Sequence, residues 1–455
     1  MKIKHFVFSM LLGTALVSSC SDSENTVVGT EPTDPKVDTP AAGFTYATSR
    51  NVEFALKSQV TTVVSVYSMY SEKDKKVSGL LVEDLLVSSE AKSLELNIPI
   101  GCNKLYIEYP TANGKKITPY EISDVLTRAT AVQSLPEDAV AATSEQDAGF
   151  TFLHNTGVVM FEDEWPEIAR DNDYNDVVME YDLKVTECND ESLFASQGYK
   201  EGLLMTMDVR AIGGLYPTQV GVVLKGLDKK FIKTIDARLM RKAGNGVKVG
   251  FEKVSHINNG SGRIEYIEAD SQDGKKYHLY IDTTQDDLII YLDGLRNLTD
   301  QDRFYQVDPK KVKEGIPMVR VEIEIKGDLR TSSTDNSEQW LAYRKMITKT
   351  ENQDFFIKKN IGKSVEIHMR GYQPTYEYAE NYFKDAGEWA NEPVKYAGTN
   401  NFTWGLKLPA GTKHVQEKVD IKDAYPEYAE WVSSGGAENK DWYLHPDPEK
   451  VIKYW

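Results

Sequence analysis

Hydrophobic and polar residues alternate along much of the chain, with a period of two residues. This period is typical of β-strands that bury one face and expose the other. It is clearest in four segments, residues 51–57, 93–100, 319–325 and 365–369. Residues 288–292 are apolar throughout and precede Asp293-Gly294, which predicts a strand buried on both faces and followed by a turn. We therefore expect a mainly β protein with few helices.

Alternating segments are most closely spaced between residues 44 and 130. Strands are expected at 51–57, 61–68, 77–87, 93–100, 105–109 and 116–122. Residues 93–100 and 105–109 are joined by Gly101-Cys102-Asn103, which predicts a β-hairpin. The spacing predicts a small N-terminal β-sandwich of the immunoglobulin or transthyretin type at 44–130. A linker is expected at 131–146, and a larger β-rich module of sandwich or jelly-roll type at 147–455.

One helix is predicted near the C-terminus. Asp423 is expected to cap it, and Pro426 suits its first turn. Tyr428 and Trp431 would share one face of this helix. Gly435-Gly436 is expected to end it.

The first twenty residues have the layout of an export signal. Lys2 and Lys4 precede an apolar stretch, residues 6–17, which is shorter than the ~20 residues needed to span a bilayer. Val17-Ser18-Ser19-Cys20 resembles the bacterial lipobox, in which small residues precede a cysteine that becomes lipidated. The resemblance implies that residues 1–19 are a lipoprotein signal peptide and that Cys20 anchors the protein to a membrane. The alternative is an ordinary signal peptide followed by a chance cysteine.

Residues 20–43 contain three prolines, five acids and few large apolar side chains. Such a segment cannot bury enough apolar surface to fold, so we expect a disordered acidic stalk. Its first residues, Ser21-Asp22-Ser23-Glu24-Asn25, are similar to the export signal of surface lipoproteins in Gram-negative gut bacteria. This similarity implies an outer-membrane lipoprotein exposed on the cell surface. A plain polar tether is the alternative, and it leaves surface or periplasm open.

Acidic residues outnumber basic ones, 70 to 53, which gives a formal net charge of −17. Nucleic-acid binding depends on clustered Lys and Arg, so a nucleic-acid partner is disfavoured. The sequence contains no G-x-G-x-x-G or G-x-x-x-x-G-K-[ST] motif for a nucleotide, no G-x-S-x-G nucleophile motif and no H-E-x-x-H zinc motif. We therefore predict no catalytic residue and no organic cofactor.

One segment, residues 161–183, carries candidate chemistry. Asp171, Asp173 and Asn175 fall at alternate positions, and Asp176 follows directly. Oxygens packed this densely repel one another unless a cation neutralises them. Calcium, which takes about 6–8 oxygen ligands, fits such a loop better than magnesium, which keeps more of its water. We predict a structural calcium site, with Glu162 and Asp163 near enough in sequence to complete the shell.

The spacing invites comparison with an EF-hand, whose first three ligand positions match Asp171, Asp173 and Asn175. The sixth position must be glycine for a sharp turn, and here it is Asp176. Residues 177–183 alternate like a strand where an EF-hand requires a helix. We therefore expect a calcium loop that leads into a strand. A solvated acidic turn without an ion is the alternative.

The wider sequence resembles a known family. Phe161-Glu-Asp-Glu-Trp-Pro166 and Asp171-Asn-Asp-Tyr-Asn-Asp-Val-Val178 resemble the signature of LruC-domain proteins, which are exported proteins of Gram-negative bacteria. Residues 404–409 and 423–443 are similar to segments near the end of that family. The resemblance spans residues 147–455 and implies a β-rich module with a bound calcium ion. By motif match, the ion ligands would be Asp163, Asp171, Asp173, Asn175 and Asp176.

Two smaller sets of residues leave alternatives open. The exported location permits a disulfide between Cys102 and Cys188, and two free thiols are the alternative. Five tryptophans lie in the last seventy residues, where they could pack under the predicted helix or form a platform that stacks on sugars. They are Trp389, Trp404, Trp431, Trp442 and Trp455.

These features favour a surface-anchored lipoprotein that is not an enzyme. We expect a calcium-stabilised binding or adhesion module for a glycan, the matrix or a partner protein. One alternative is a fimbria-like structural subunit, in which one chain donates a strand to the next. Another is a glycan-degrading enzyme that uses a pair of carboxylates. The sequence does not name the ligand.

Overall fold

The computed structural model describes residues 43–122, 131–142, 149–166, 171–188, 202–227, 234–242, 248–251, 257–258, 263–267, 277–299, 304–312, 318–326, 336–360, 362–398 and 402–453. The expected signal peptide, the expected lipidation site Cys20 and nearly all of the expected stalk lie outside these described residues. Within them, no helix is both long enough and apolar enough to cross a membrane.

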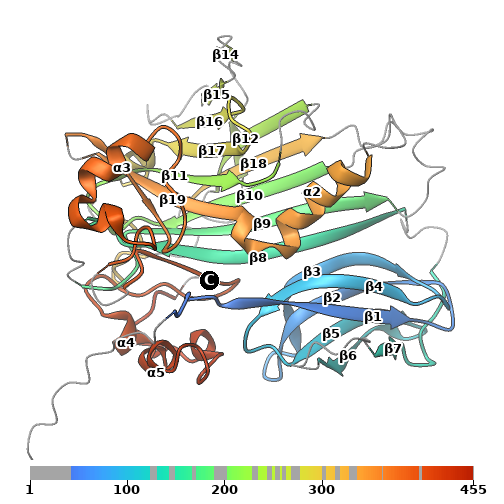
Figure 1. Ribbon diagram of the computed structural model, residues 1–455. Helices are drawn as coiled ribbons and strands as arrows, with labels where there is room; N and C mark the ends of the chain where they lie inside the picture. Colours follow the sequence, from blue (N-terminus) through green and yellow to red (C-terminus); the bar gives the residue numbers. More distant parts are fainter. Residues whose placement is uncertain are drawn as a thin grey trace, which may run out of the picture. The chain divides into compact units, whose positions relative to one another are not determined.

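The described residues form a mainly β fold, as predicted, with three sheets and few helices (Figure 1). The first sheet has the order β4 (Lys92–Pro99), β1 (Ser49–Lys57) and β7 (Val132–Ser134). The second has the order β13 (Lys248–Phe251), β12 (Thr234–Lys242), β18 (Met318–Lys326), β10 (Gly202–Ala211), β9 (Val177–Cys188), β8 (Phe150–Phe161), β3 (Lys76–Val87), β2 (Thr62–Ser71), β5 (Lys104–Thr111) and β6 (Gly114–Glu121), with β21 (Gly405–Pro409) paired to β8.

The third sheet and the helices complete the described part of the chain. This sheet has the order β14 (Ile257–Asn258), β15 (Arg263–Ile267), β16 (His278–Asp282), β17 (Leu288–Asp293), β11 (Pro217–Leu224), β19 (Gln353–Asn360) and β20 (Ser364–His368). The α-helices are α2 (Asn336–Thr348), α3 (Ala379–Asp385), α4 (Ile421–Ala424) and α5 (Tyr428–Ser433). Short 3-10 helices are η2 (Leu295–Leu298), η3 (Thr350–Asn352), η4 (Gly387–Asn391) and η6 (Trp442–Leu444). Helix α2 contacts β4, β8 and β9 (Figure 1).

The strands β1 to β7 form the β-sandwich expected near the N-terminus. One of its layers is β4-β1-β7, and the other is the β3-β2-β5-β6 end of the second sheet. Val52, Phe54 and Leu56 of β1 alternate with more exposed neighbours and are buried. They share one core with Leu105 and Ile107 of β5, which lies in the other layer. The alternation therefore identified the buried faces of β1 and β5 correctly.

The predicted hairpin between residues 93–100 and 105–109 is wrong. Strand β4 pairs with β1, whereas β5 pairs with β2 and β6, so residues 101–103 lead from one sheet to the other. Alternation shows that a strand has one buried face, but it does not identify the strand that lies beside it. Cys102 in this connection has a free thiol, whose Sγ lies 3.0 Å from the carbonyl oxygen of Lys104. The side chain of Cys188 lies outside the described residues.

The sandwich and the following strands share the second sheet. Strand β3 pairs with β8 at Val82–Leu153 and Glu83–Phe152, and β8 pairs along its length with β9. The expected linker, residues 131–146, contributes β7, which runs parallel to β1. The hydrogen-bonded sheet therefore continues from the sandwich into the larger module.

Strand β17 is buried on both faces, as its apolar sequence predicts. Leu288, Ile290 and Leu292 belong to the main core. Ile289 and Tyr291 belong to a smaller cluster on the opposite face of the same sheet. A strand with two buried faces cannot alternate, because neither set of side chains meets water.

The single helix predicted near the C-terminus is two short helices, α4 and α5. Asp420, rather than Asp423, caps α4, since its carboxylate accepts a hydrogen bond from a backbone N–H of the first turn. Tyr425 ends this helix with φ −127° and ψ 86°. A residue before proline is pushed out of the helical conformation, and Pro426 therefore separates the two helices.

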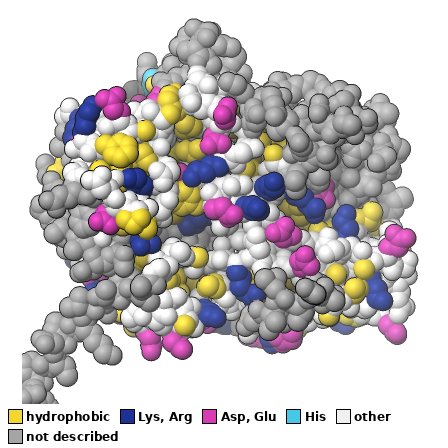
Figure 2. Space-filling view, in the orientation of Figure 1, with side chains coloured by type: hydrophobic (Ala, Val, Ile, Leu, Met, Phe, Trp, Pro, Cys, Tyr) yellow, Lys and Arg dark blue, Asp and Glu magenta, His cyan; other side chains and the backbone are white. Residues whose placement is uncertain are grey.

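The tryptophans that the structure describes pack inside the molecule. Trp404, Trp431 and Trp442 are buried, and the ring centroids of Trp431 and Trp442 lie 5.4 Å apart. These three rings are therefore core residues rather than a sugar platform. The side chains of Trp389 and Trp455 lie outside the described residues. On the face seen in Figure 2, acidic and basic side chains are mixed, so the acidic surplus forms no continuous acidic surface there.

Candidate functional site

Residues 162–176, which contain the predicted ion ligands, connect β8 to β9. The two strands pair as far as Phe161 and Val177, so both ends of the connection lie side by side. Asn172 and Tyr174 each have a φ of +51°, a left-handed conformation that is uncommon for residues with a side chain. Two such residues close together turn the chain sharply, which brings carboxylates from both ends of the connection near one another.

Three carboxylates form one cluster, which we call the acidic cluster: Glu162, Asp171 and Asp173. One oxygen from each lies within 4.8 Å of the others. Glu162 and Asp173 are only 1% and 2% exposed, and Asp171 is partly exposed. The structure therefore brings together two of the predicted ion ligands, Asp171 and Asp173, with the neighbouring Glu162.

Burial and repulsion between like charges raise the pKa of these carboxyls. Burial, followed by the charge of Asp171, raises the pKa of Asp173 to about 8. Burial, followed by the charge of Asp173, raises the pKa of Glu162 well above its usual value. The same two causes, burial and the charge of Asp171, raise the pKa of Glu417 to about 7. A cation would offset both the lost hydration and the repulsion.

Asp163 and Asp176 form a second group beside the acidic cluster. The backbone N–H of Asp163 donates to Asp176 Oδ2 (2.6 Å), and the N–H of Tyr216 donates to Asp163 Oδ2 (3.1 Å). Burial raises the pKa of both carboxyls. The guanidinium of Arg296, in η2, interacts electrostatically with both of them. These two predicted ligands therefore already have N–H donors and a basic neighbour.

Asn175 ties the connection to two other segments. Its Nδ2 donates to the carbonyl oxygen of Val415 (3.2 Å), and its own carbonyl oxygen accepts from the N–H of Gly213 (2.9 Å). Its Oδ1 is buried and has no hydrogen-bond partner among the described residues. A Cβ at Gly213 would lie 2.0 Å from this Oδ1, so only glycine fits there. The Gly213-Gly214 pair was the sequence signal for this close approach.

Residues 417–421 also contribute to the site, and the sequence did not predict this contribution. Glu417 interacts electrostatically with the acidic cluster, because the charge of Asp171 helps burial to raise the pKa of its carboxyl. The N–H of Lys418 donates to Asp173 Oδ2 (2.8 Å), and the N–H of Ile421 donates to the carbonyl oxygen of Asn172 (2.9 Å). No local sequence pattern links these residues to a loop more than two hundred positions earlier.

The donor set of the acidic cluster fits a hard cation. Carboxylate oxygens are the ligands that calcium prefers. Glu162 Oε2 is buried and has no hydrogen-bond partner within the described part of the chain. A further set of metal-ligand side chains, Glu427, Asp441 and His445, is more exposed, and there Glu427 already hydrogen-bonds His445 at 2.8 Å. The buried cluster therefore offers the stronger cation site of the two.

A cavity of about 840 Å³ lies where the start of β1 and the end of β4 meet β8, β21 and the segment that follows β20. This volume falls in the range of about 300–1,000 Å³ that is typical of small-molecule sites. Amide and hydroxyl side chains are frequent in its lining. The cavity is a second candidate site, separate in its lining residues from the acidic cluster.

A chain of amide hydrogen bonds joins the walls of this cavity. Asn155 Nδ2 of β8 donates to Asn97 Oδ1 of β4 (3.2 Å). Asn97 Nδ2 donates to Asn51 Oδ1 of β1 (2.7 Å), and the hydroxyl of Tyr181 donates to Asn155 Oδ1 (3.2 Å). These bonds orient the polar side chains in advance, which reduces the entropy lost when a ligand binds.

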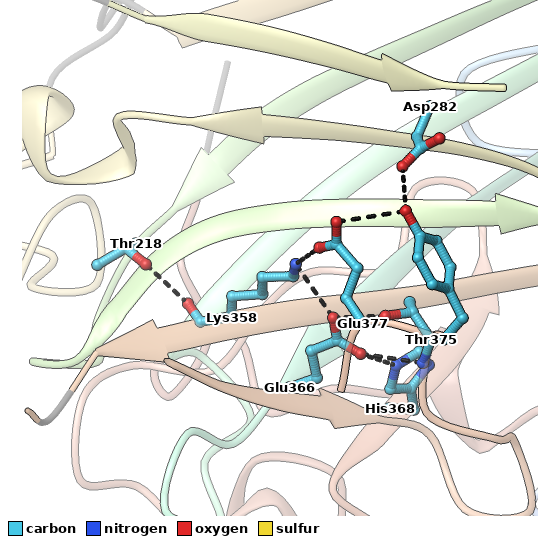
Figure 3. Close-up of polar contacts among 8 residues, drawn as sticks. Thr218, Asp282, Lys358, Glu366, His368, Thr375 and Glu377 are labelled. Carbon is cyan, nitrogen blue, oxygen red and sulfur yellow. Dashed lines mark hydrogen bonds and ion pairs between the residues drawn. The ribbon is translucent and has the colours of Figure 1, made fainter. Parts of the chain in front are cut away.

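A buried network of charges lies on the third sheet (Figure 3). The ring nitrogens of His368 lie 2.9 Å from Asp354 Oδ1 and 3.4 Å from Glu366 Oε2, and Lys358 Nζ lies 3.1 Å from Glu366 Oε1. Burial alone would lower the pKa of His368, but the Asp354 and Glu366 carboxylates outweigh it and raise this pKa to about 9. Both ring nitrogens face a carboxylate, so neither is available to a metal. The network balances buried charges and supports the sheet.

Two comparisons place the chain among known proteins. The family model described as a domain of unknown function, DUF4842, matches residues 202–443. A crystal structure of a putative lipoprotein from Bacteroides ovatus is 39% identical, covers 87% of this chain and 100% of that chain, and has a TM-score of 0.74. No protein with a curated description matches the chain.

Two further solved structures are much less similar. The major pilin subunit BcpA of Bacillus cereus is 7% identical over 70% of this chain and 66% of that chain, with a TM-score of 0.15. A carbohydrate-binding module of the β-sandwich superfamily is 11% identical over 62% of this chain and 92% of that chain, with a TM-score of 0.14. TM-scores this low support no argument about fold or function. The DUF4842 match and the Bacteroides ovatus relative together show that this chain belongs to the DUF4842 family.

Proposed function

We propose that this protein is a lipid-anchored module of the bacterial cell surface, stabilised by calcium, that binds a glycan. The observation that carries the binding function is the cavity of about 840 Å³ with its chain of amides. A concave site of this size suits a small ligand, whereas a protein partner requires a broad surface of about 800 Å² on each side. Amides and hydroxyls can pair with sugar hydroxyls, and Tyr181 and Tyr372 add aromatic rings to the lining.

Two observations support the lipid anchor. Val17-Ser18-Ser19-Cys20 has the form of a lipobox, and the relative from Bacteroides ovatus is described as a putative lipoprotein. Residues 21–25, which include Asp22 and Glu24, are similar to the export signal of surface lipoproteins and support export to the outer face of the outer membrane. In this proposal residues 20–43 are a stalk that separates the folded part from the membrane.

Calcium has a structural role in this proposal. Glu162, Asp171 and Asp173 would hold the ion, with Glu417 nearby. The resemblance of residues 161–178 to the LruC signature supports the same assignment. Three more residues predicted from the sequence stabilise or complete the site: Asp163, Asn175 and Asp176.

A glycan array tests the binding function directly, with the full chain in detergent. Ala47 is exposed and lines the cavity, so Ala47→Trp should obstruct it without disturbing the core. We expect the wild type to bind a defined class of glycans and Ala47→Trp to bind at least tenfold more weakly. Ala112→Trp, on an exposed turn away from the cavity, is the matched control and should bind normally.

Two results of this experiment would contradict the proposal. One is the absence of binding to every glycan on the array. The other is binding that Ala47→Trp leaves unchanged, since the ligand would then occupy another surface. Turnover of a bound glycan that a single carboxylate substitution abolishes would instead identify an enzyme.

A further inference from the structure

The cavity is basic, although the chain as a whole has a net charge of −17. Among the described residues that line it, one, the exposed Glu351, is acidic. Four are basic: Arg50, Lys225, Arg370 and Lys407. They come from β1, the end of β11, the end of β20 and β21, so the tertiary fold gathers them. Positive charge along the walls of a concave site focuses the electrostatic potential on a bound anion.

Lys407 has uncharged hydrogen-bond acceptors. Its Nζ donates to Gln353 Oε1 (2.6 Å) and to the carbonyl oxygen of Thr350 (3.3 Å). Burial lowers the pKa of Lys407 to about 7, against the opposing charges of Asp354 and Glu351. An anion bound beside this amine would favour its charged form, because it would supply the close opposite charge that the two amide-type oxygens do not.

Lys225 and Arg370 extend the basic wall. Lys225 Nζ lies 4.5 Å from the ring centroid of Tyr372 and forms an ion pair with Asp354 Oδ2 (3.4 Å), whose side chain is buried while that of Lys225 remains partly exposed. Arg370 Nη1 donates to the carbonyl oxygen of Phe44 (3.0 Å), which orients the planar guanidinium. An oriented guanidinium matches the planar, two-oxygen geometry of a carboxylate, and it also binds sulfate oxygens well.

We propose that the cavity binds an acidic glycan, whose carboxylate or sulfate group contacts Lys225, Arg370 and Lys407. This inference rests on the proposed glycan-binding function and adds the charge of the ligand. In this arrangement the amide of Asn97, which the buried Asn155 orients, binds the sugar hydroxyls. The hydroxyls of a neutral glycan of the same size can accept hydrogen bonds from the basic side chains, but they do not supply the opposite charge that makes such bonds to a carboxylate or sulfate stronger.

Isothermal titration calorimetry with paired probes tests the charge of the ligand. The probes are trisaccharides of galacturonate, glucuronate and a sulfated hexose, each paired with its neutral methyl ester or unsulfated form. The full chain in detergent is expected to bind at least one acidic member ten or more times more tightly than its neutral counterpart. The preference should weaken as the salt concentration rises, because ions screen the basic wall.

Two variants locate the interaction. Lys225→Gln removes a positive charge from the wall, and Lys407→Gln removes an amine whose charged form a bound anion would favour. Each variant should weaken binding of the acidic probe about tenfold. Either variant suffices if the other does not fold, as judged by circular dichroism. Lys384→Gln is the control, since Lys384 is exposed on α3 and pairs with Glu380. It should bind the acidic probe like the wild type.

The outcomes separate this inference from the proposed function. Equal binding of acidic and neutral probes would overturn the acidic-ligand inference and keep the glycan-binding function. Binding of sulfate or acetate alone as tightly as the trisaccharides would show a site for small anions and overturn the inference. An acidic preference that both cavity variants retain would overturn its assignment to this cavity. No binding of any sugar, on the array or here, would overturn both proposals.

Discussion

Asp173 illustrates at the scale of one residue why a cation would stabilise the acidic cluster. It is 2% exposed, and Asp171 and Glu162 lie beside it. Two backbone N–H groups, from Asn175 and Lys418, donate to its oxygens, but these dipoles do not cancel a full charge. The carboxylate therefore costs free energy in the absence of an ion and contributes affinity in its presence.

The acidic cluster predicts different effects of Asp173→Asn in the presence and in the absence of calcium. The substitution removes a charge and keeps one of the two oxygens that accept the N–H groups of Asn175 and Lys418, while an amide nitrogen replaces the other. With calcium present, we expect at least tenfold weaker binding of the ion and a melting temperature lower by a few degrees. In EDTA, the variant should lose less stability than it loses with calcium, because the relieved repulsion offsets the one hydrogen bond that the amide nitrogen cannot accept.

Calcium titration and thermal melts with and without EDTA measure these effects. Asp423→Asn is the matched control, because Asp423 is exposed and lies outside the acidic cluster. If elemental analysis finds no calcium and EDTA leaves the wild-type melt unchanged, the calcium proposal is wrong.

At the scale of elements, β19 and β20 carry buried charged residues that neutralise one another only when the two strands pair. Asp354 and Lys358 lie on β19, while Glu366 and His368 lie on β20, and antiparallel pairing brings them together. Burial alone would raise the pKa of Glu366, but the hydrogen bond from His368 and the charge of Lys358 outweigh it and lower this pKa to about 2. Glu366 and His368 therefore both stay charged over a wide pH range.

The network predicts a loss of stability in alkaline solution. The folded state raises the pKa of His368 from 6.5 to about 9, so this contribution is complete below pH 6.5 and disappears as the pH rises through about 9. The folded state lowers the pKa of Glu366 from 4.5 to about 2, so its contribution is complete above pH 4.5 and disappears as the pH falls toward 2. We expect a loss on the order of 3 kcal/mol between pH 6 and pH 9.5.

Urea denaturation of the wild type and of His368→Gln at these two pH values measures the loss. The variant should lack this pH dependence, while His445→Gln, which removes an exposed histidine, should keep it. NMR titration of the His368 imidazole gives its midpoint independently. Equal pH dependence in the wild type and in His368→Gln would refute the assignment.

At the scale of the whole molecule, the second sheet joins the N-terminal sandwich to the larger module. The pairing of β3 with β8 makes the sheet continuous, and buried side chains on both sides of it belong to one core. The amide bond from Asn155 to Asn97 adds a polar contact between the same two parts. Parts that share a sheet and a core unfold together, because separating them exposes apolar surface and backbone hydrogen-bonding groups.

We therefore expect residues 44–453 to unfold in a single transition. Ile107, fully buried in β5, is a suitable probe, and Ile107→Ala should lower the free energy of unfolding by about 2–5 kcal/mol. Calorimetry of this variant should show the whole transition at a lower temperature. Val132→Ala, at a position that is 46% exposed, should change it little. Two transitions, of which only one moves, would show that the expected domain at 44–130 unfolds alone.

Much of the fold and part of the candidate site follow from local features of the sequence. Alternation identifies a strand and its buried face, because successive side chains of any strand point to opposite sides. The apolar residues 288–292 identified a strand with two buried faces in the same way. The closeness of Asp171 and Asp173 could be predicted, because the residues of one short loop must lie near each other.

The tertiary structure decided the features that depend on segments distant in the sequence. Strand β4 pairs with β1 rather than with β5, which follows it in the sequence. Alternation within one strand does not specify its partner, because the partner depends on how distant segments pack. Glu417 approaches the acidic cluster for the same reason. The basic cavity exists only in the folded chain, because Lys225, Arg370 and Lys407 come from separate strand ends and edges. Local periodicity determines what each segment is, and the packing of the whole chain determines which segments meet.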